Sequence, residues 1–235
     1  MQKIANEMNL SETAFLVPKP GIHGEYDLRW FTPTVEMDLC GHATLASGHV
    51  VLNHLNKGLE RVTFHTRSGA LGVDNRNGLI ELDFTSNPPT VVTEPDEISA
   101  VGAALDSTPV EVLHANTTVA VFEKESDVAA LRPDFTAVAQ LKYPWLAATA
   151  LADKSEYDFI SRFFVPTTGV NEDPATGSSH TILMPYWSKR LRRDKLVGRQ
   201  ISARGGTMYC ELAGDRVKIA GNVAGIMTGE LNFKL

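Results

Sequence analysis

The apolar residues of this chain cluster into two long runs, each of which predicts a buried helix. The run 43–55 is rich in Ala, Val and Leu and contains no acidic residue, a pattern typical of a helix that is buried nearly all round. A second run begins at Ser178, and Pro185 inside it lacks a backbone N–H, so we expect this helix to be kinked or shortened. A third helix is predicted over 98–105, after the acidic start at 94–97.

Shorter segments that are bounded by turn residues predict strands between these helices. The predicted strands are 14–17, 61–66, 70–74, 79–84, 111–116, 119–122, 146–151, 159–165, 199–203, 208–212, 217–219 and 225–233. The sequence Asn87-Pro88-Pro89 interrupts the pattern, and we place a domain boundary near residue 92. The expected domains are therefore 1–92 and 93–235, each with strands around one long apolar helix.

Two similar aromatic segments indicate an internal duplication. Residues 29–34 (RWFTPT) are echoed 133 positions later by residues 162–167 (RFFVPT). In both copies a polar loop follows, and a glycine then opens the apolar helical run. These glycines, Gly41 and Gly177, are 136 positions apart, so the second loop is three residues longer. Two such matches could arise by chance, but a duplicated α/β unit also explains the surrounding pattern of strands and helices.

The composition and charge exclude several classes of protein. The 235 residues include 43% apolar and 21% charged side chains, which is typical of a globular protein with one large or two small domains. The net charge of −6 opposes a broad polyanion-binding surface, so we expect no nucleic-acid partner. No stretch approaches the roughly 20 apolar residues that span a membrane, and no signal peptide is present, so we expect a cytoplasmic protein without a membrane partner. The two cysteines lack metal-ligand spacing and are expected to be free thiols.

The two predicted helix starts are the first candidates for a binding site. If Gly41 and Gly177 both begin helices, unpaired N–H groups and the positive ends of two helix dipoles could face one cleft. Such a cleft favours a small anion, most plausibly a carboxylate, and Thr176 and Ser178 add hydroxyl groups. The glycine patterns of phosphate-binding loops and dinucleotide-binding folds are absent, so no nucleotide cofactor is expected.

Four side chains near these motifs are candidates for proton transfer. His42 could carry a proton or could be structural, and Cys40 could be a nucleophile, a base or simply a buried thiol. Asp173 could orient a proton donor or cap a helix. Glu12 could be a turn carboxylate or a base, and partial burial is expected to raise its pKa toward neutral pH.

Four segments together resemble the PhzF-like family of phenazine-biosynthesis isomerases: 8–13 (MNLSET), 29–33 (RWFTP), 38–44 (DLCGHAT) and 172–178 (EDPATGS). They occur in the order found in the family, and the resemblance covers essentially the whole chain. It implies an α+β fold like that of diaminopimelate epimerase, with two pseudo-symmetric domains that each wrap a mixed sheet around a central helix. The active site of this fold lies between the domains, and a homodimer is expected.

The resemblance also assigns roles to residues. Glu12 would move a proton between carbon atoms of a small carboxylic acid substrate without a cofactor or metal. His42 and Asp173 would assist this transfer. Members of the family begin with a strand hairpin that contains Gly-Asn-Pro, and this chain starts after it, inside the expected first helix. The residues expected to hold the substrate are Gly41, Thr176, Gly177 and Ser178.

Two other functions remain open from the sequence. A two-base epimerase or racemase of the same fold would use paired thiols, but the repeat places Thr176 opposite Cys40, so one thiol is missing. A non-catalytic protein that binds a small acid would need none of the proton-transfer groups. The presence of Glu12, His42 and Asp173 argues for catalysis over binding alone.

Overall fold

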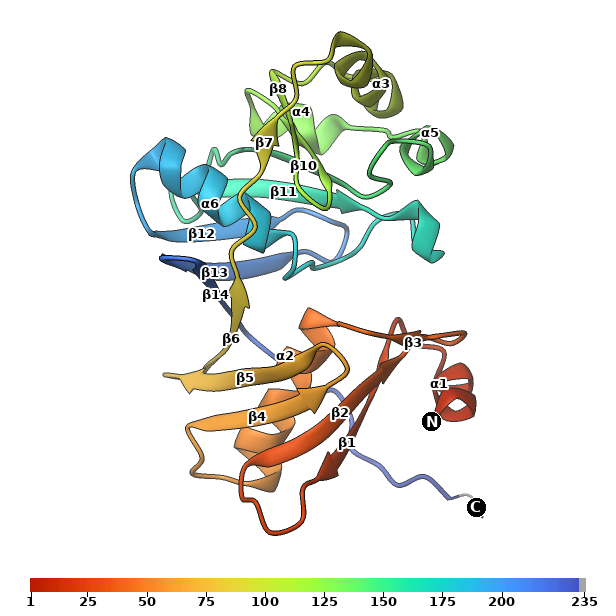
Figure 1. The fold of residues 1–235 in the computed structure, drawn as a ribbon, viewed down its shortest axis with the longest axis vertical. Coiled ribbons are helices and arrows are strands. Elements are labelled where there is room, and N and C mark those ends of the chain that lie inside the picture. The colour runs from red at the N-terminus through yellow and green to blue at the C-terminus, as the bar shows by residue number, and fades with distance from the viewer. Residues whose placement is uncertain (233–235) are drawn as a thin grey trace.

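The computed structural model describes residues 1–232 and consists of two lobes that share one continuous mixed sheet (Figure 1). The helices are α1 (Gln2–Met8), α2 (Gly41–Val50, continued by a π-helical turn at Val51–Leu55), α3 (Pro95–Leu105), α4 (Glu125–Ala130), α5 (Phe135–Ala139) and α6 (His180–Leu191), with a 3₁₀ turn at Pro166–Thr168. The strands of the first lobe are β1 (Thr13–Pro18), β2 (Glu25–Phe31), β3 (Glu36–Met37), β4 (Arg61–Thr66), β5 (Gly69–Arg76) and β6 (Leu79–Thr85). Those of the second lobe are β7 (Thr90–Val91), β8 (Glu111–His114), β9 (Thr118–Val121), β10 (Leu146–Leu151), β11 (Phe159–Phe164), β12 (Lys195–Gln200), β13 (Gly206–Ala213) and β14 (Arg216–Gly221).

The strand pairing of the first lobe is repeated in the second. In the first lobe, β1 and β2 are antiparallel, β2 and β4 are parallel, and β4, β5 and β6 continue antiparallel. The second lobe has the same sequence of pairings in β10, β11, β12, β13 and β14. Each lobe places its long apolar helix, α2 or α6, in the parallel crossover. The expected two-fold repeat of a mixed sheet around a central helix is therefore confirmed.

The repeat extends to matching side-chain contacts. Arg29 on β2 donates to both carboxylate oxygens of Glu36, and Arg162 on β11 does the same to Glu172. Each arginine also lies over an aromatic ring two residues later, Phe31 or Phe164. The three additional residues of the second copy fall in the loop that contains the 3₁₀ turn. Because β6 and β14 pair antiparallel, the equivalent last strands of the two lobes form the junction between them.

A glycine and a proline shape the two central helices. A Cβ at Gly48 of α2 would lie 2.4 Å from Cγ1 of Val73 on β5, so the close approach of helix and sheet requires glycine. In α6, Pro185 cannot donate to the carbonyl of Thr181, and the backbone N–H of Asn87 donates to that carbonyl instead, at 3.0 Å. The linker between the lobes thus satisfies the group that the proline leaves free, and α6 continues to Leu191.

The structure corrects several sequence-based expectations. Helix α2 is not buried all round, because His42, Ala46 and Val50 are exposed along one face. The second central helix begins at His180 rather than at Ser178. The strand predicted over 199–203 is instead β12, which ends at Gln200 because Ser202 forms a turn by donating to the carbonyl of Pro174 and accepting from the N–H of Gly205.

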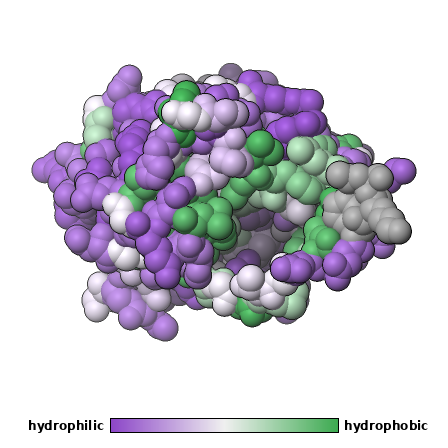
Figure 2. All heavy atoms as spheres, turned by 90° about the horizontal axis from the view of Figure 1, so that it is seen from below, coloured by the Kyte–Doolittle hydropathy of each residue, from purple (hydrophilic) through white to green (hydrophobic). Residues whose placement is uncertain are grey.

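The chain after β14 also differs from the expectation. A strand was predicted over 225–233, but residues 222–232 form none and extend past the first lobe, and residue 233 lies outside the described residues (Figure 1). The neighbouring side chains of Ile226 and Met227 are both exposed, so this segment lacks the alternation of a half-buried strand. Figure 2 views the molecule from below relative to Figure 1, where the first lobe lies, and shows a hollow with hydrophobic residues along part of its edge. No helix within residues 1–232 combines the length and apolar character needed to cross a membrane.

Candidate active site

The turn before β1 brings Glu12 to the start of α2. Helix α1 ends at Asn9, whose left-handed backbone (φ 48°) reverses the chain. Glu12 follows this turn, immediately before β1, and its side chain is only 16% exposed. Nε2 of His42 lies 2.8 Å from Oε2 of Glu12 and donates a hydrogen bond to it. The structure therefore brings together two of the predicted site residues that are 30 positions apart.

The start of α2 leaves backbone donors free. Cys40 is the N-cap residue, has an extended backbone and makes no side-chain cap. Its carbonyl accepts from the N–H and the hydroxyl of Thr44, at 3.1 and 2.6 Å. The N–H groups of Gly41 and His42 come before the first intrahelical bond and have no partner within the helix. Gly41 therefore begins a helix, as predicted, and can offer an N–H to a bound anion.

The thiol of Cys40 lies against the His42 ring. Its Sγ is 3.7 Å from Nε2 and 3.9 Å from Nδ1, and the residue is 6% exposed. A sulfur in line with one ring N–H would be much farther from the other nitrogen, so the thiol sits beside the ring and does not extend a relay from Glu12. Glu12, Cys40 and His42 together offer oxygen, sulfur and nitrogen, the three donor types that bind zinc.

The pairing with His42 controls the ionisation of Glu12. Burial raises the pKa of Glu12, but the hydrogen bond and charge of His42, together with a hydrogen bond from Ser11, outweigh burial and hold it below its usual value. The expectation that burial would raise this pKa is therefore wrong while His42 is in place. The contacts with Cys40 and then Glu12 outweigh desolvation and raise the pKa of His42 to about 10. At neutral pH the pair is a carboxylate and an imidazolium.

The second group of predicted residues lies in the loop between β11 and α6. The N–H of Asp173 donates to the carbonyl of Phe163 at 2.9 Å, which holds the loop against the end of β11. The carboxylate of Asp173 accepts a hydrogen bond from the hydroxyl of Thr176, and Thr176 is buried. Thr176, which takes the position of Cys40 in the second copy of the repeat, is thus hydrogen-bonded to an acidic side chain.

Gln200 fixes this loop and was not singled out in the sequence. Its side chain is fully buried, and its Oε1 accepts from the N–H of Thr176 at 2.8 Å. Its Nε2 donates to the carbonyl of Asp173 at 2.6 Å and to the hydroxyl of Thr176 at 3.3 Å. The only sequence signal was an amide inside a predicted strand, which does not reveal what it contacts.

The turn that precedes α6 provides the remaining predicted residues. Gly177 does not begin the helix, because residues 177–179 form a turn in which its carbonyl accepts from the N–H of His180. Ser178 is exposed, and no side chain caps the helix. His180 is fully buried, and its Nδ1 donates to the carbonyl of Thr176 at 2.9 Å. The N–H groups of Gly177 and Ser178 donate to no group among the described residues, and His180 anchors the base of the turn.

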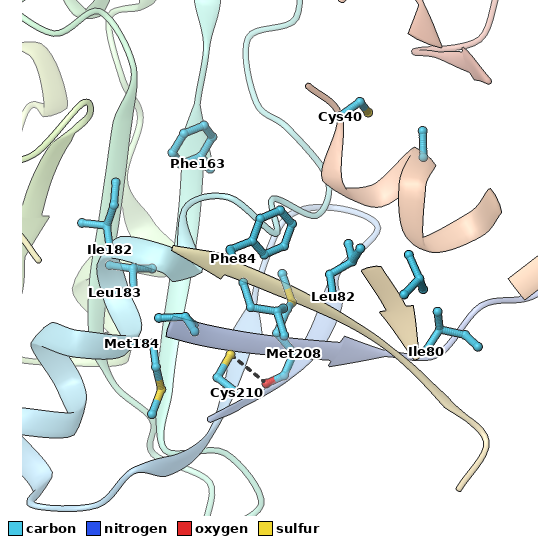
Figure 3. Close-up of a cluster of buried hydrophobic side chains, with 14 of the residues drawn as sticks. Cys40, Ile80, Leu82, Phe84, Phe163, Ile182, Leu183, Met184, Met208 and Cys210 are labelled. Atoms are coloured by element: carbon cyan, nitrogen blue, oxygen red, sulfur yellow. Dashed lines mark hydrogen bonds between the residues drawn. The ribbon is translucent and has the colours of Figure 1, made fainter. Parts of the chain in front are cut away.

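An apolar cluster links the two groups of site residues. Figure 3 shows Cys40 at the start of α2, with Phe84, Phe163 and Met208 lying between the two lobes. Ala175, in the loop that carries Asp173 and Thr176, packs against the same cluster. No hydrogen bond among the described residues joins Glu12 or His42 to Asp173. The predicted site residues therefore form two polar groups joined by one apolar cluster.

Comparison with known proteins agrees with the repeat and its motifs. The sequence profile of the PhzC-PhzF family, described as phenazine biosynthesis-like protein, matches residues 1–229. An uncharacterized isomerase from Pseudomonas aeruginosa is 46% identical over 235 residues, covering 99% of this chain and 87% of the relative. A phenazine biosynthesis-like domain-containing protein from Mus musculus is 36% identical over 253 residues, covering 98% of this chain and 87% of the relative.

Solved structures show the same fold. A putative phenazine biosynthesis PhzC/PhzF protein from Clostridium difficile has a TM-score of 0.90 at 38% identity, covering 99% of this chain and 87% of that chain. A probable proline racemase from Agrobacterium radiobacter has a TM-score of 0.56 at 10% identity, covering 98% of this chain and 81% of that chain, and shares the fold alone. The expected α+β, epimerase-like fold is confirmed, and this chain belongs to the PhzC-PhzF family of phenazine biosynthesis-like proteins.

Proposed function

We propose that this protein is an isomerase that moves a proton between carbon atoms of a small carboxylic acid, with Glu12 as both base and acid and with no cofactor. The observation that carries the proposal is the 2.8 Å contact between Glu12 and His42 at the free start of α2. Relatives from Pseudomonas aeruginosa and Halalkalibacterium halodurans are named uncharacterized isomerases, which supports the reaction class. The site itself supports the role of each residue.

Glu12 has the properties of a base whose strength depends on the substrate. Before the substrate binds, the Glu12 carboxylate is ionised and can accept a proton from carbon. A substrate that draws the His42 hydrogen bond to itself removes the contact that lowers the pKa of Glu12 and leaves the effect of burial, which raises it. The base therefore becomes stronger when the substrate binds, and the proton can return from the same carboxylate to another carbon.

The negative charge that develops on the substrate needs stabilisation. The His42 imidazolium and the N–H groups of Gly41 and His42 can supply it from the start of α2. Gly177 and Ser178 offer further N–H groups for a substrate carboxylate. Thr176 helps to hold the substrate, and Asp173, which accepts from the Thr176 hydroxyl, assists the transfer by Glu12. This distribution of donors favours a small acid that reaches from one lobe to the other.

The experiment follows exchange of carbon-bound hydrogen for deuterium in a panel of small carboxylic acids, by NMR in D₂O. Wild-type protein should exchange and isomerise at least one acid, and Glu12→Gln should slow this by about 10²- to 10⁴-fold. Glu25→Gln is the matched control. Oε2 of Glu25 lies 2.6 Å from Nε2 of His65, so Glu25 forms the same kind of pair with a histidine outside this site. Undiminished turnover by Glu12→Gln would exclude Glu12 as the base.

The contact between Cys40 and His42 favours one alternative, an epimerase that uses the thiol as its base. This alternative expects Cys40→Ala to abolish exchange and the product to carry solvent deuterium at an inverted stereocentre. The proposal instead expects Cys40→Ala to retain exchange. Tight binding of an acid without any exchange by wild-type protein would indicate a binding protein.

A further inference from the structure

The side chains of Glu12, Cys40 and His42 have a property that proton transfer does not require. Their ligating atoms, a carboxylate oxygen, a sulfur and a ring nitrogen, all lie within 4.8 Å of one another. Nε2 of His42 is the nitrogen nearest to both partners, at 2.8 Å from Oε2 of Glu12 and 3.7 Å from Sγ of Cys40. One nitrogen therefore lies close to both of the other donors: it donates to the Glu12 carboxylate, and the Cys40 sulfur lies beside its ring.

These separations approach those of a tetrahedral zinc site. Zinc bonds of about 2.0–2.1 Å to nitrogen and oxygen and about 2.3 Å to sulfur hold neighbouring ligand atoms about 3.3–3.6 Å apart. The nitrogen–oxygen distance must increase by about half an ångström to fit, and the nitrogen–sulfur distance already lies close to this range. The ion would replace the proton that Glu12 and His42 now share, and a change of the Cys40 side-chain rotamer would bring Sγ from beside the ring to the side on which Nε2 meets Glu12.

The surroundings leave one side of the cluster open. Cys40 is nearly buried, and Glu12 is only 16% exposed, but the side chain of His42 is 42% exposed on the open face of α2. An ion could enter from this face and keep a fourth position for water, as ions with three protein ligands do. The donors also come from two ordered elements, the start of β1 and the start of α2.

We propose that Glu12, Cys40 and His42 bind one Zn²⁺ ion and that this ion inhibits the enzyme by occupying the Glu12 carboxylate. Binding releases the proton that His42 donates to Glu12 and the thiol proton of Cys40 to solvent, and it involves no oxidation or reduction. The inhibition rests on the proposed function of Glu12, whereas the binding site does not. Zinc thus acts here as a reversible inhibitor and not as a cofactor.

The first experiment measures zinc binding by competition with a chromophoric chelator, using the whole chain. Wild-type protein should bind one Zn²⁺ per chain, and Cys40→Ser, which preserves the shape of the side chain, should bind it about 100-fold more weakly or worse, since loss of an outer-shell partner alone costs 10- to 100-fold. Co²⁺ in place of zinc should give a near-ultraviolet thiolate charge-transfer band that Cys40→Ser lacks. This band reports ligation and would not respond to a merely structural effect of the substitution.

Two variants serve as matched controls. Cys210→Ser removes the other thiol, which is buried in the apolar cluster and donates to the carbonyl of Met208 at 3.8 Å (Figure 3). His65→Asn breaks the Glu25–His65 pair, which has the same chemistry as Glu12–His42. Both controls should bind zinc like the wild type. Wild-type binding no tighter than that of Cys40→Ser, or loss of binding in Cys210→Ser, would overturn the site.

The second experiment adds zinc to the deuterium-exchange assay. Exchange should stop in proportion to zinc occupancy in the wild type and recover when a chelator is added. If zinc binds through these ligands but exchange continues, the inhibitory role is overturned and Glu12 is excluded as the base, while the metal site stands. If exchange depends on Glu12 but zinc binds no better than to Cys40→Ser, the zinc site is overturned and the proposed function stands.

Discussion

His180 should make this protein acid-labile, because its imidazole is buried without a place for a second proton. The side chain is 0% exposed, and Nδ1 uses its proton to bond the carbonyl of Thr176. Nε2 has no hydrogen-bond partner among the described residues and packs against Gly198, where it lies 2.9 Å from the position that a Cβ would take. The ring of Phe159 covers the same side, with its centroid 5.7 Å away.

The size of the effect follows from the pKa of this group. Burial lowers the pKa of His180 to about 4, against 6.5 for an exposed histidine, although the bond to Thr176 opposes the shift in part. Since the folded pKa is the lower one, the unfolded chain binds a proton first as the pH falls, and stability is lost between about pH 6.5 and pH 4. A difference of about 2.5 units corresponds to about 3 kcal/mol of unfolding free energy.

The assay compares urea unfolding of wild-type protein and His180→Asn between pH 7 and pH 4. Asparagine keeps a donor near the carbonyl of Thr176 but does not titrate, and at pH 7 the variant should be less stable because its smaller side chain leaves a cavity. The difference between the two proteins should shrink by about 3 kcal/mol on going to pH 4. His23→Asn, at an exposed position, should follow the wild type.

Parallel loss of stability by wild-type protein and His180→Asn would refute this reasoning. It would mean that His180 is protonated in the folded protein or reaches water. All other titratable groups are the same in the two proteins, so the difference between their plots of unfolding free energy against pH isolates the contribution of His180.

Three further predictions concern packing, the loop before α6 and assembly. Gln200→Ala should lower the unfolding free energy by about 1–3 kcal/mol for each buried group it leaves unpaired, and it should reduce turnover more than substrate binding. Unchanged unfolding and turnover would contradict the role of Gln200 in holding Thr176. Gly48→Ala should cost about 1–3 kcal/mol in chemical unfolding because its Cβ meets Val73, whereas Gly225→Ala, which faces open space, should change little. We also predict a homodimer, and a light-scattering mass near that of one chain, 25.6 kDa, would exclude it.

The sequence by itself predicted the repeated unit. The Arg-aromatic-aromatic strand, the proline after it and the glycine that opens an apolar run are local features, so two copies of them specify two copies of the same strand, loop and helix. The Arg29–Glu36 and Arg162–Glu172 pairs show why the repeat holds in space, since each ties the loop back onto its own strand. The three-residue difference in spacing likewise located the longer loop.

Local patterns were less reliable where burial depends on distant parts of the chain. The apolar run of α2 predicts a helix buried nearly all round, but one face is exposed, because hydrophobicity says which residues can be buried and not which faces find a partner. The same reason explains the exposed Ile226 and Met227 in a predicted strand. Gly177 precedes its helix by a turn, a boundary difference that composition does not reveal.

Only the tertiary structure decided which polar groups meet. Glu12 reaches His42 because a left-handed Asn9 ends α1 and places β1 against α2, and this contact reverses the expected direction of the pKa shift of Glu12. Gln200 reaches Thr176 because β12 lies beside β11 in parallel register. Side-chain chemistry is written in the sequence, but hydrogen bonds and pKa values depend on distances of a few ångströms, which strand register and the path of the loops determine.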